Sequence, residues 1–303
     1  MGARGSVGRY ATLSEATQAD KPSIEQAGDL PLDSHLHTDL SPDSNVAIDA
    51  YAAQAVERRI DEIAITDHID FDPTAPAFNY ATYVTRERQV REAAERWASD
   101  GLQIRFGTEI TYASEFETDI REHLRQYRYD FVIGSVHVGD RSPYRADAVQ
   151  GWVAGRSIAA IVRPYFDEVT AAARSGLFDT LGHVDFIKRY LYPHLTPADF
   201  AAAPELYEPM LRAMVESGVG LEINTRGLRQ SPAETYPAAP IVALFRELGG
   251  KHVTAGSDAH LAGSFAYGLE DGYRVAAGAG FQELMFRRGG SRLAVPLPAR
   301  LRT

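Results

Sequence analysis

Short apolar segments alternate with longer amphipathic segments along most of this chain, beginning near Leu32. The apolar segments have the length of strands, and the amphipathic ones have helical spacing. Such alternation predicts repeated strand–helix units, and therefore an α/β fold with a parallel sheet. The expected strands cover residues 32–38, 62–67, 102–111, 130–138, 178–186, 219–224 and 252–258.

The segments between the strands predict the helices. These are expected at residues 46–59, 79–99, 157–175, 205–217 and 238–248, and segment 114–127 shows a weaker helical pattern. Pro164 is expected to break or restart its helix. Gly176, Gly218 and Gly249 follow helical segments, where a left-handed residue often ends a helix. The tail from Glu283 predicts a hairpin that turns at Gly289-Gly290 and caps the barrel.

Composition bounds the domain organisation and the chemistry. Residues 1–30 show no sustained period and predict a flexible leader, whereas 31–303 suit one α/β barrel domain. The chain has no cysteine, so any transition metal must be held by imidazole and carboxylate. No apolar run predicts a signal peptide or a membrane span, so we expect a soluble, cytoplasmic protein. The net charge of −10 argues against a broad nucleic-acid surface but permits a small phosphorylated substrate.

Metal-ligand side chains recur where the expected strands end. The first strand ends in His35-Leu-His37, whose imidazoles lie two residues apart and share one face. The other ends supply His68, Glu109, His137, His183 and the pair Asp258 and His260, and Asp43 lies in the loop after the first strand.

In α/β barrels the carboxyl ends of the strands and the loops after them build the active site. These nine side chains should therefore converge on one site. Nine donors exceed the three protein ligands of one catalytic zinc ion, so we expect two or three divalent ions, with Glu109 as the bridging carboxylate.

A strand-end histidine can also be a hydrogen-bonded structural group. One shared location for all of them makes that alternative a poor account of the set. We interpret His123, His194 and His252, which lie elsewhere, as structural. Asp67 and Asp185 flank ligand positions and could either orient imidazoles or cap the chain locally.

Cations follow two of the strands. Lys188 and Arg189 come after the fifth strand, and Arg226 and Arg229 after the sixth. Surface solvation is their simplest explanation, but arginine forks also fit phosphate oxygens, which makes these residues candidates for substrate binding.

The ordered motifs of residues 32–298 resemble the PHP family. They are His35-Leu-His37, Thr66-Asp-His68, Gly107-Thr-Glu109, Gly134-Ser-Val-His137, Gly182-His-Val-Asp185 and Ser257-Asp-Ala-His260. The resemblance implies an irregular (β/α)7 barrel, similar to a TIM barrel, with a trinuclear site for Zn, Mn or Fe. Within the family, the segments around Gly134, Gly182 and Glu222 resemble histidinol-phosphatases. They imply hydrolysis of L-histidinol phosphate, a step of histidine biosynthesis, by a hydroxide that bridges metal ions.

The resemblance also implies a role for each residue. His35, His37, Glu109 and Asp258 would hold one ion, Glu109, His137 and His183 a second, and Asp43, His68 and His260 a third. Glu109, Asp258 and His260 would be catalytic, and Lys188 and Arg229 would meet the substrate. Two positions depart from the family pattern, because Asp43 replaces a frequent histidine and Arg226 replaces a small serine.

Two rival functions remain. PHP modules also resemble nucleases attached to DNA polymerases, which would act on DNA ends or another phosphorylated molecule. The acidic charge and the absence of a polymerase region count against a nuclease. A non-catalytic barrel that binds metals for structure is the second rival, and the full set of ligands counts against it.

Overall fold

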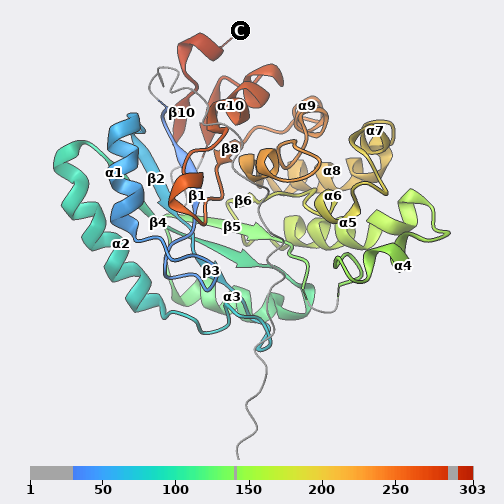
Figure 1. The fold of residues 1–303 in the computed structure, drawn as a ribbon, viewed down its shortest axis with the longest axis horizontal. Helices are drawn as coiled ribbons and strands as arrows, with labels where there is room; N and C mark the ends of the chain where they lie inside the picture. The colour runs from blue at the N-terminus through green and yellow to red at the C-terminus, as the bar shows by residue number, and fades with distance from the viewer. Residues whose placement is uncertain (1–29, 140–141, 286–292, 303) are drawn as a thin grey trace, which may run out of the picture.

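A sheet of eight strands forms the centre of the molecule (Figure 1). The structure is a computed structural model and describes residues 30–139, 142–285 and 293–302. The strands follow the order β1-β2-β4-β5-β6-β7-β8, β3 pairs with β4, and all these pairs are parallel. Their bounds are β1 Asp33–Leu36, β2 Glu62–Ile65, β3 His68–Ile69, β4 Gln103–Thr111, β5 Phe131–Ser135, β6 Thr180–Leu181, β7 Gly220–Asn224 and β8 Val253–Gly256.

The first and last strands of this order meet and nearly close the sheet into a barrel. A parallel bridge joins Leu36 to Ala259, just beyond β8. The backbone N–H of His37 donates to Ala259 O at 3.0 Å, and that of Asp258 donates to His35 O at 2.8 Å. The expected α/β barrel is therefore confirmed. The sheet contains the seven expected strands and one additional strand of two residues, β3.

Helices surround the barrel (Figure 1). The longer ones are α1 Ile48–Arg58, α2 Tyr83–Trp97, α3 Glu117–Gln126, α5 Ile158–Ser175, α8 Glu208–Ser217, α9 Ala239–Glu247 and α10 Leu269–Gly278. Short helices are α4 Val149–Val153, α6 Lys188–Leu191 and α7 Pro197–Ala201. Among the described residues no helix has the length and apolarity needed to cross a membrane.

Pro164 does not interrupt its helix, so the expected break was wrong. Helix α5 runs through it from the N-cap Ser157, whose side chain accepts from Ala160 N, to Gly176. A proline inside a helix costs about 3 kcal/mol. Burial of an apolar face that includes Phe166 and Val169 outweighs this cost, because each buried side chain contributes roughly 1.5–3 kcal/mol.

The helix ends agree with the sequence pattern. Gly176, Gly218 and Gly249 all have positive φ, as expected of residues that end helices. The expected hairpin is present as the antiparallel strands β9 Glu283–Met285 and β10 Ala294–Pro296, and its turn at Gly289-Gly290 lies outside the described residues. The leader expected at 1–30 also lies outside them, except for Leu30.

Strand β6 is shorter than expected because the chain turns just after Gly182, over residues 184–187. A Cβ at Gly182 would lie 2.5 Å from Ser135 Oγ and 2.9 Å from Ile133 Cγ2, so a larger residue would displace both side chains. The next residue, His183, has a positive φ of 29°. The turn aims His183 across the end of the barrel instead of continuing the strand.

Candidate metal centre

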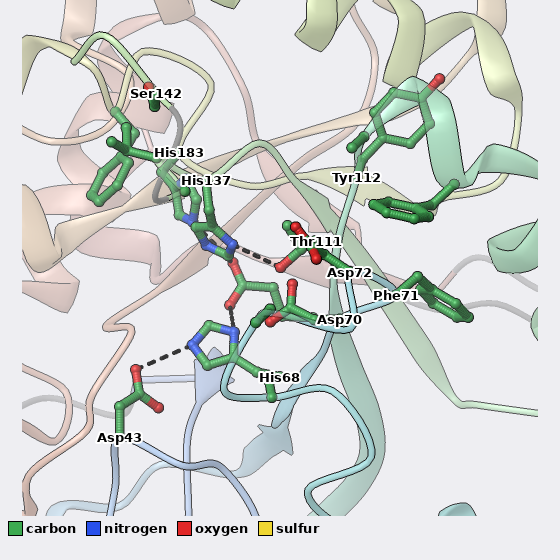
Figure 2. A pocket seen from close by; sticks show the side chains of 18 of the residues that line it. Asp43, His68, Asp70, Phe71, Asp72, Thr111, Tyr112, His137, Ser142 and His183 are labelled. Carbon is green, nitrogen blue, oxygen red and sulfur yellow. Dashed lines mark hydrogen bonds and ion pairs between the residues drawn. The ribbon is translucent and has the colours of Figure 1, made fainter. Parts of the chain in front are cut away.

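Six histidines and three acids meet at the carboxyl ends of the strands, and we call this group the nine-donor cluster. Its members are His35, His37, Asp43, His68, Glu109, His137, His183, Asp258 and His260. Figure 2 shows His68, His137 and His183 together, with His68 joined to Asp43. The structure therefore brings together every side chain that the sequence selected as a metal ligand.

Glu109 lies at the centre of the nine-donor cluster because β4 is long enough to reach past its neighbours. The carboxylate is buried, and its two oxygens face different histidines. Oε1 lies 2.9 Å from His183 Nε2 and 3.3 Å from His137 Nε2. Oε2 lies 2.9 Å from His68 Nδ1, 3.3 Å from His35 Nε2 and 3.4 Å from His37 Nε2.

Asp258 and Asp43 lie on different sides of the cluster. Asp258 Oδ1 is 3.5 Å from His37 Nε2 and 4.0 Å from His35 Nε2. Asp43 Oδ2 is 3.0 Å from His260 Nε2 and 3.4 Å from His68 Nε2. Asp258 thus lies beside His35 and His37, and Asp43 beside His68 and His260, but the groups overlap, because Glu109 also contacts His68 and Asp258 also contacts His260 at 3.3 Å.

The donor set fits divalent metal ions. Three triads have ligand atoms within 4.8 Å of one another: His37, His68 and His260; His35, His37 and Asp258; and His68, Glu109 and His137. His35 Nε2 lies 2.9 Å from His37 Nε2, so the two imidazoles can direct nitrogen lone pairs toward one cation. Imidazole with carboxylate is the ligand chemistry of Zn, Mn and Fe.

The pKa shifts of Glu109 and His35 show that the buried carboxylates of the cluster favour a positive charge beside them. Burial alone would raise the pKa of Glu109, but His35, His137 and His68 outweigh it and hold that pKa well below the usual range. Burial disfavours a proton on His35, yet the carboxylates of Glu222 and Glu109 raise the pKa of His35 well above its ordinary value. A bound cation would meet this demand in place of the proton.

The backbone is strained at two residues of the cluster that follow the ends of strands β8 and β6. Asp258 has φ 50° and His183 has φ 29°, both in the left-handed region that side chains other than glycine rarely adopt. Such strain is typical of functional sites, where surrounding contacts hold it in place. At Asp258 these contacts include Asn224 Nδ2, which donates to Oδ2 at 3.1 Å.

Glu222 on β7 is a residue that the sequence interpretation did not select. It is fully buried behind the cluster, 2.5 Å from His35 Nδ1, and it accepts from His183 N at 3.1 Å. A carboxylate on the far nitrogen of a metal-binding imidazole fixes its tautomer and orientation. The sequence did contain a signal for this role, because Glu222 is a charged residue between the apolar Leu221 and Ile223 of a buried strand. Thr111 plays a similar part for His137, with Oγ1 3.0 Å from Nδ1.

Asp67 and Asp185 join segments that are distant in the sequence, and their side-chain hydrogen bonds are not to imidazoles. Asp67 accepts from Thr38 N, Thr38 Oγ1 and Ser41 Oγ, which holds the loop that carries Asp43. Asp185 accepts from Ala238 N and pairs with Lys188.

A cavity of about 570 Å³ opens over the nine-donor cluster. Six of the cluster residues line it: Asp43, His68, Glu109, His137, His183 and Asp258. Its outer wall is aromatic and acidic, formed by Phe71, Tyr112, Phe116, Phe186, Tyr190, Asp70, Asp72 and Glu115. The cavity can therefore hold a small molecule that has one anionic end and one cationic or aromatic end.

The four candidate substrate-binding cations divide into two pairs. Arg189 and Arg226 line the cavity. Lys188 instead turns into the protein, where its Nζ lies 2.9 Å from Asp185 and donates to Thr235 O at 2.6 Å. Arg229 donates to the backbone oxygens of Ser257 and Ser264, and, like Lys188, it is not among the residues that line the cavity.

The remaining histidines lie outside the cluster, as expected. His123 contacts Tyr129 Oη at 2.8 Å and stacks among aromatic rings. His194 is exposed, and His252 lies directly before β8. None of the three lines the cavity.

Comparison with known proteins gives consistent results. Residues 33–226 match the PHP domain family. The probable histidinol-phosphatase of Deinococcus radiodurans is 30% identical over 261 residues, covering 84% of this chain and 96% of that protein. The histidinol-phosphatase of Lactococcus lactis is 27% identical over 254 residues, covering 84% and 93%.

A solved structure is similar over nearly the whole described region. The crystal structure of histidinol phosphate phosphatase from Lactococcus lactis, in complex with Zn, L-histidinol and phosphate, superposes with a TM-score of 0.76 at 25% identity. The match covers 88% of this chain and 100% of that chain.

Proposed function

This chain belongs to the PHP domain family, and on that premise we propose that it is a metal-dependent phosphomonoesterase that hydrolyses L-histidinol phosphate to L-histidinol and phosphate. The observation that carries the proposal is the convergence of the nine-donor cluster beneath one cavity, which six of its members line. Relatives named histidinol-phosphatase match over most of their length, which supports the choice of substrate.

The nine-donor cluster would hold two or three divalent ions, with Zn, Mn and Fe as the candidates. Bound ions would supply an activated water for attack on phosphorus and would neutralise the phosphate oxygens. Glu109 would bridge ions through its two separately directed oxygens, while Asp258 and His260 would hold ions on the side of the cavity that faces Arg226.

The chain's own residues do the positioning. Glu222 and Thr111 hold the His35 and His137 imidazoles in fixed orientations, so that little reorganisation is needed when substrate binds. Arg189 and Arg226 present guanidinium groups to the cavity and would bind phosphate oxygens. Lys188 would support the site from behind through Asp185.

The outer wall of the cavity fits the leaving group. L-histidinol carries an ammonium group and an imidazole ring. Acidic side chains such as Asp70 would attract the cation, and Phe71 and Tyr112 offer ring surfaces for stacking. The cytoplasmic location and the absence of a nucleic-acid partner stay predictions.

The test is steady-state hydrolysis by the purified protein with its metal content measured on the same sample. We expect kcat/KM for L-histidinol phosphate to exceed that for other small phosphomonoesters, and no degradation of single-stranded DNA. A metal-loaded protein that left L-histidinol phosphate intact would refute the proposal. Preferential degradation of DNA would favour the nuclease instead.

A further inference from the structure

Arg226 brings a positive charge into contact with two proposed metal ligands. Its Nη1 donates to Asp258 Oδ1 at 3.0 Å and lies 3.0 Å from His260 Nδ1 and 3.3 Å from His260 Nε2. Its backbone N–H donates to Asn224 Oδ1 at 3.0 Å. When the amide oxygen and nitrogen of Gln230 are exchanged, the oxygen accepts from Arg226 Nε at 3.2 Å. The guanidinium is therefore held at the cluster from both ends.

The negative charge that could offset a metal ion is unevenly distributed. The His35 and His37 side of the cluster contacts both Glu109 and Asp258, which are buried. On the other side, Glu109 contacts His68 and Asp258 contacts His260, but the carboxylate that contacts both histidines is Asp43, whose side chain is 41% exposed. Screening by water weakens the attraction that such an exposed carboxylate can exert.

Arg226 is adjacent to this weaker side. An ion bound to His260 Nε2 would lie about 2.1 Å from that nitrogen, and so no farther than about 5.4 Å from Arg226 Nη1. At this separation, in a largely buried site, a divalent ion and a guanidinium repel each other strongly. Of the three carboxylates that face this group, Asp43 is partly exposed, Asp258 is already paired with Arg226, and Glu109 contacts His68 but not His260, so less negative charge is left to offset an ion here.

We infer that Arg226 is a built-in counter-cation that weakens divalent-ion binding by the Asp43, His68 and His260 group, so that this chain holds two ions tightly and a third weakly. The inference rests on the metal centre of the proposed function. It concerns the number and affinity of the ions, not the reaction itself.

The experiment is titration of the metal-free, full-length protein with Zn²⁺ in competition with a chromophoric chelator. For the unaltered protein we expect two tight sites and a third at least tenfold weaker. Replacement of the guanidinium in Arg226→Ser and Arg226→Gln should tighten the third site at least tenfold. Arg226→Lys keeps the charge and should leave the third site weaker than in either neutral variant.

Arg189→Ser is the matched control, because it removes a cavity arginine that contacts Gln230 and Tyr190 but, among the described residues, no cluster ligand. It should leave all three affinities unchanged, and near-UV circular dichroism checks the fold of each variant. Three equally tight sites in the unaltered protein, or an unchanged third site in both neutral variants, would overturn the inference. A protein that binds Zn²⁺ as expected but fails to hydrolyse L-histidinol phosphate would refute the proposed function alone.

Discussion

Glu222 illustrates how residues behind the ligands determine a metal site. Its two oxygens serve different parts of the cluster, Oε1 at the His35 ring and Oε2 at the His183 backbone. Gly256 makes this approach feasible, since a Cβ there would lie 2.4 Å from His35 Cβ and 3.2 Å from Glu222 Oε1. Small residues and one buried acid thus hold the imidazole in place.

Substitution of this acid should weaken the metal site without unfolding the barrel. In Glu222→Gln the side chain keeps its size but loses the charge that holds the His35 Nδ1 proton, so we expect metal affinity and kcat to fall by about 10–100-fold. Chelator competition and steady-state kinetics measure the two effects. Glu216→Gln, an exposed site on α8, is the control. Unchanged metal affinity in Glu222→Gln would contradict this role.

Asp70 should determine preference for a cationic leaving group. Figure 2 shows Asp70 and Phe71 on the same side of the cavity as Thr111 and Tyr112. Asp70→Asn should raise KM for L-histidinol phosphate about tenfold, because a charge-assisted hydrogen bond contributes about 1.5 kcal/mol. KM for p-nitrophenyl phosphate, which has no amine, should not change. Equal effects on both substrates would assign Asp70 a structural role.

At the scale of elements, the sequence predicted the strands better than the helices between them. Strands β2, β4, β5 and β7 were identified because buried apolar residues such as Ile63, Phe106, Val132 and Ile223 recur in them, although each strand also carries polar side chains. Helix α10 was missed, since Gly272 and Gly278 lower helix propensity and only packing against Thr225 accounts for Gly272.

The candidate site was predictable where topology alone placed it. Strand ends of a barrel converge whatever the loops do, so eight of the nine proposed ligands could be selected without coordinates, and Asp43 was added from the loop after the first strand. The orientation of a long cation depends on local partners that sequence spacing does not reveal. For this reason the sequence did not reveal that Lys188 points toward Asp185. Glu222 was overlooked because its contacts join residues 187 and 39 positions apart in the chain.

Helix α3 carries a group that should make stability depend on pH. Burial, with a smaller effect of Arg86, lowers the pKa of His123 to about 4, against about 6.5 in an unfolded chain. Between these values the unfolded state binds the proton and the folded state does not. The contribution of a neutral His123 is therefore complete above pH 6.5 and is lost as the pH falls toward 4.

We expect the free energy of unfolding to fall more steeply over this window in the unaltered protein than in His123→Gln. The difference should be on the order of 1 kcal/mol after allowance for partial exposure. Urea denaturation at pH 7 and pH 5 measures it, and any loss of bound metal is common to both proteins. Parallel pH profiles would show that His123 does not titrate in this way.

For the whole molecule, ions and fold should be thermodynamically linked. An ion that binds only the folded state at 100 times its Kd adds about 2.7 kcal/mol to the free energy of unfolding. For a domain of this size we expect each tightly bound ion to raise Tm by about 5 °C. Differential scanning calorimetry before and after chelation tests this. Asp258→Asn should show a smaller shift, and an identical Tm with and without chelator would contradict the linkage.

The bridge between Leu36 and Ala259 closes the barrel between the two strands whose ends carry His35, His37, Asp258 and His260. The seam of the sheet and the proposed cation site are thus the same few residues, so ions bound there would hold the two edges of the barrel together. Without ions this seam should be where the barrel opens first. Amide protons of His37 and Asp258 would then exchange with solvent faster, while those in β4 and β5 keep their protection.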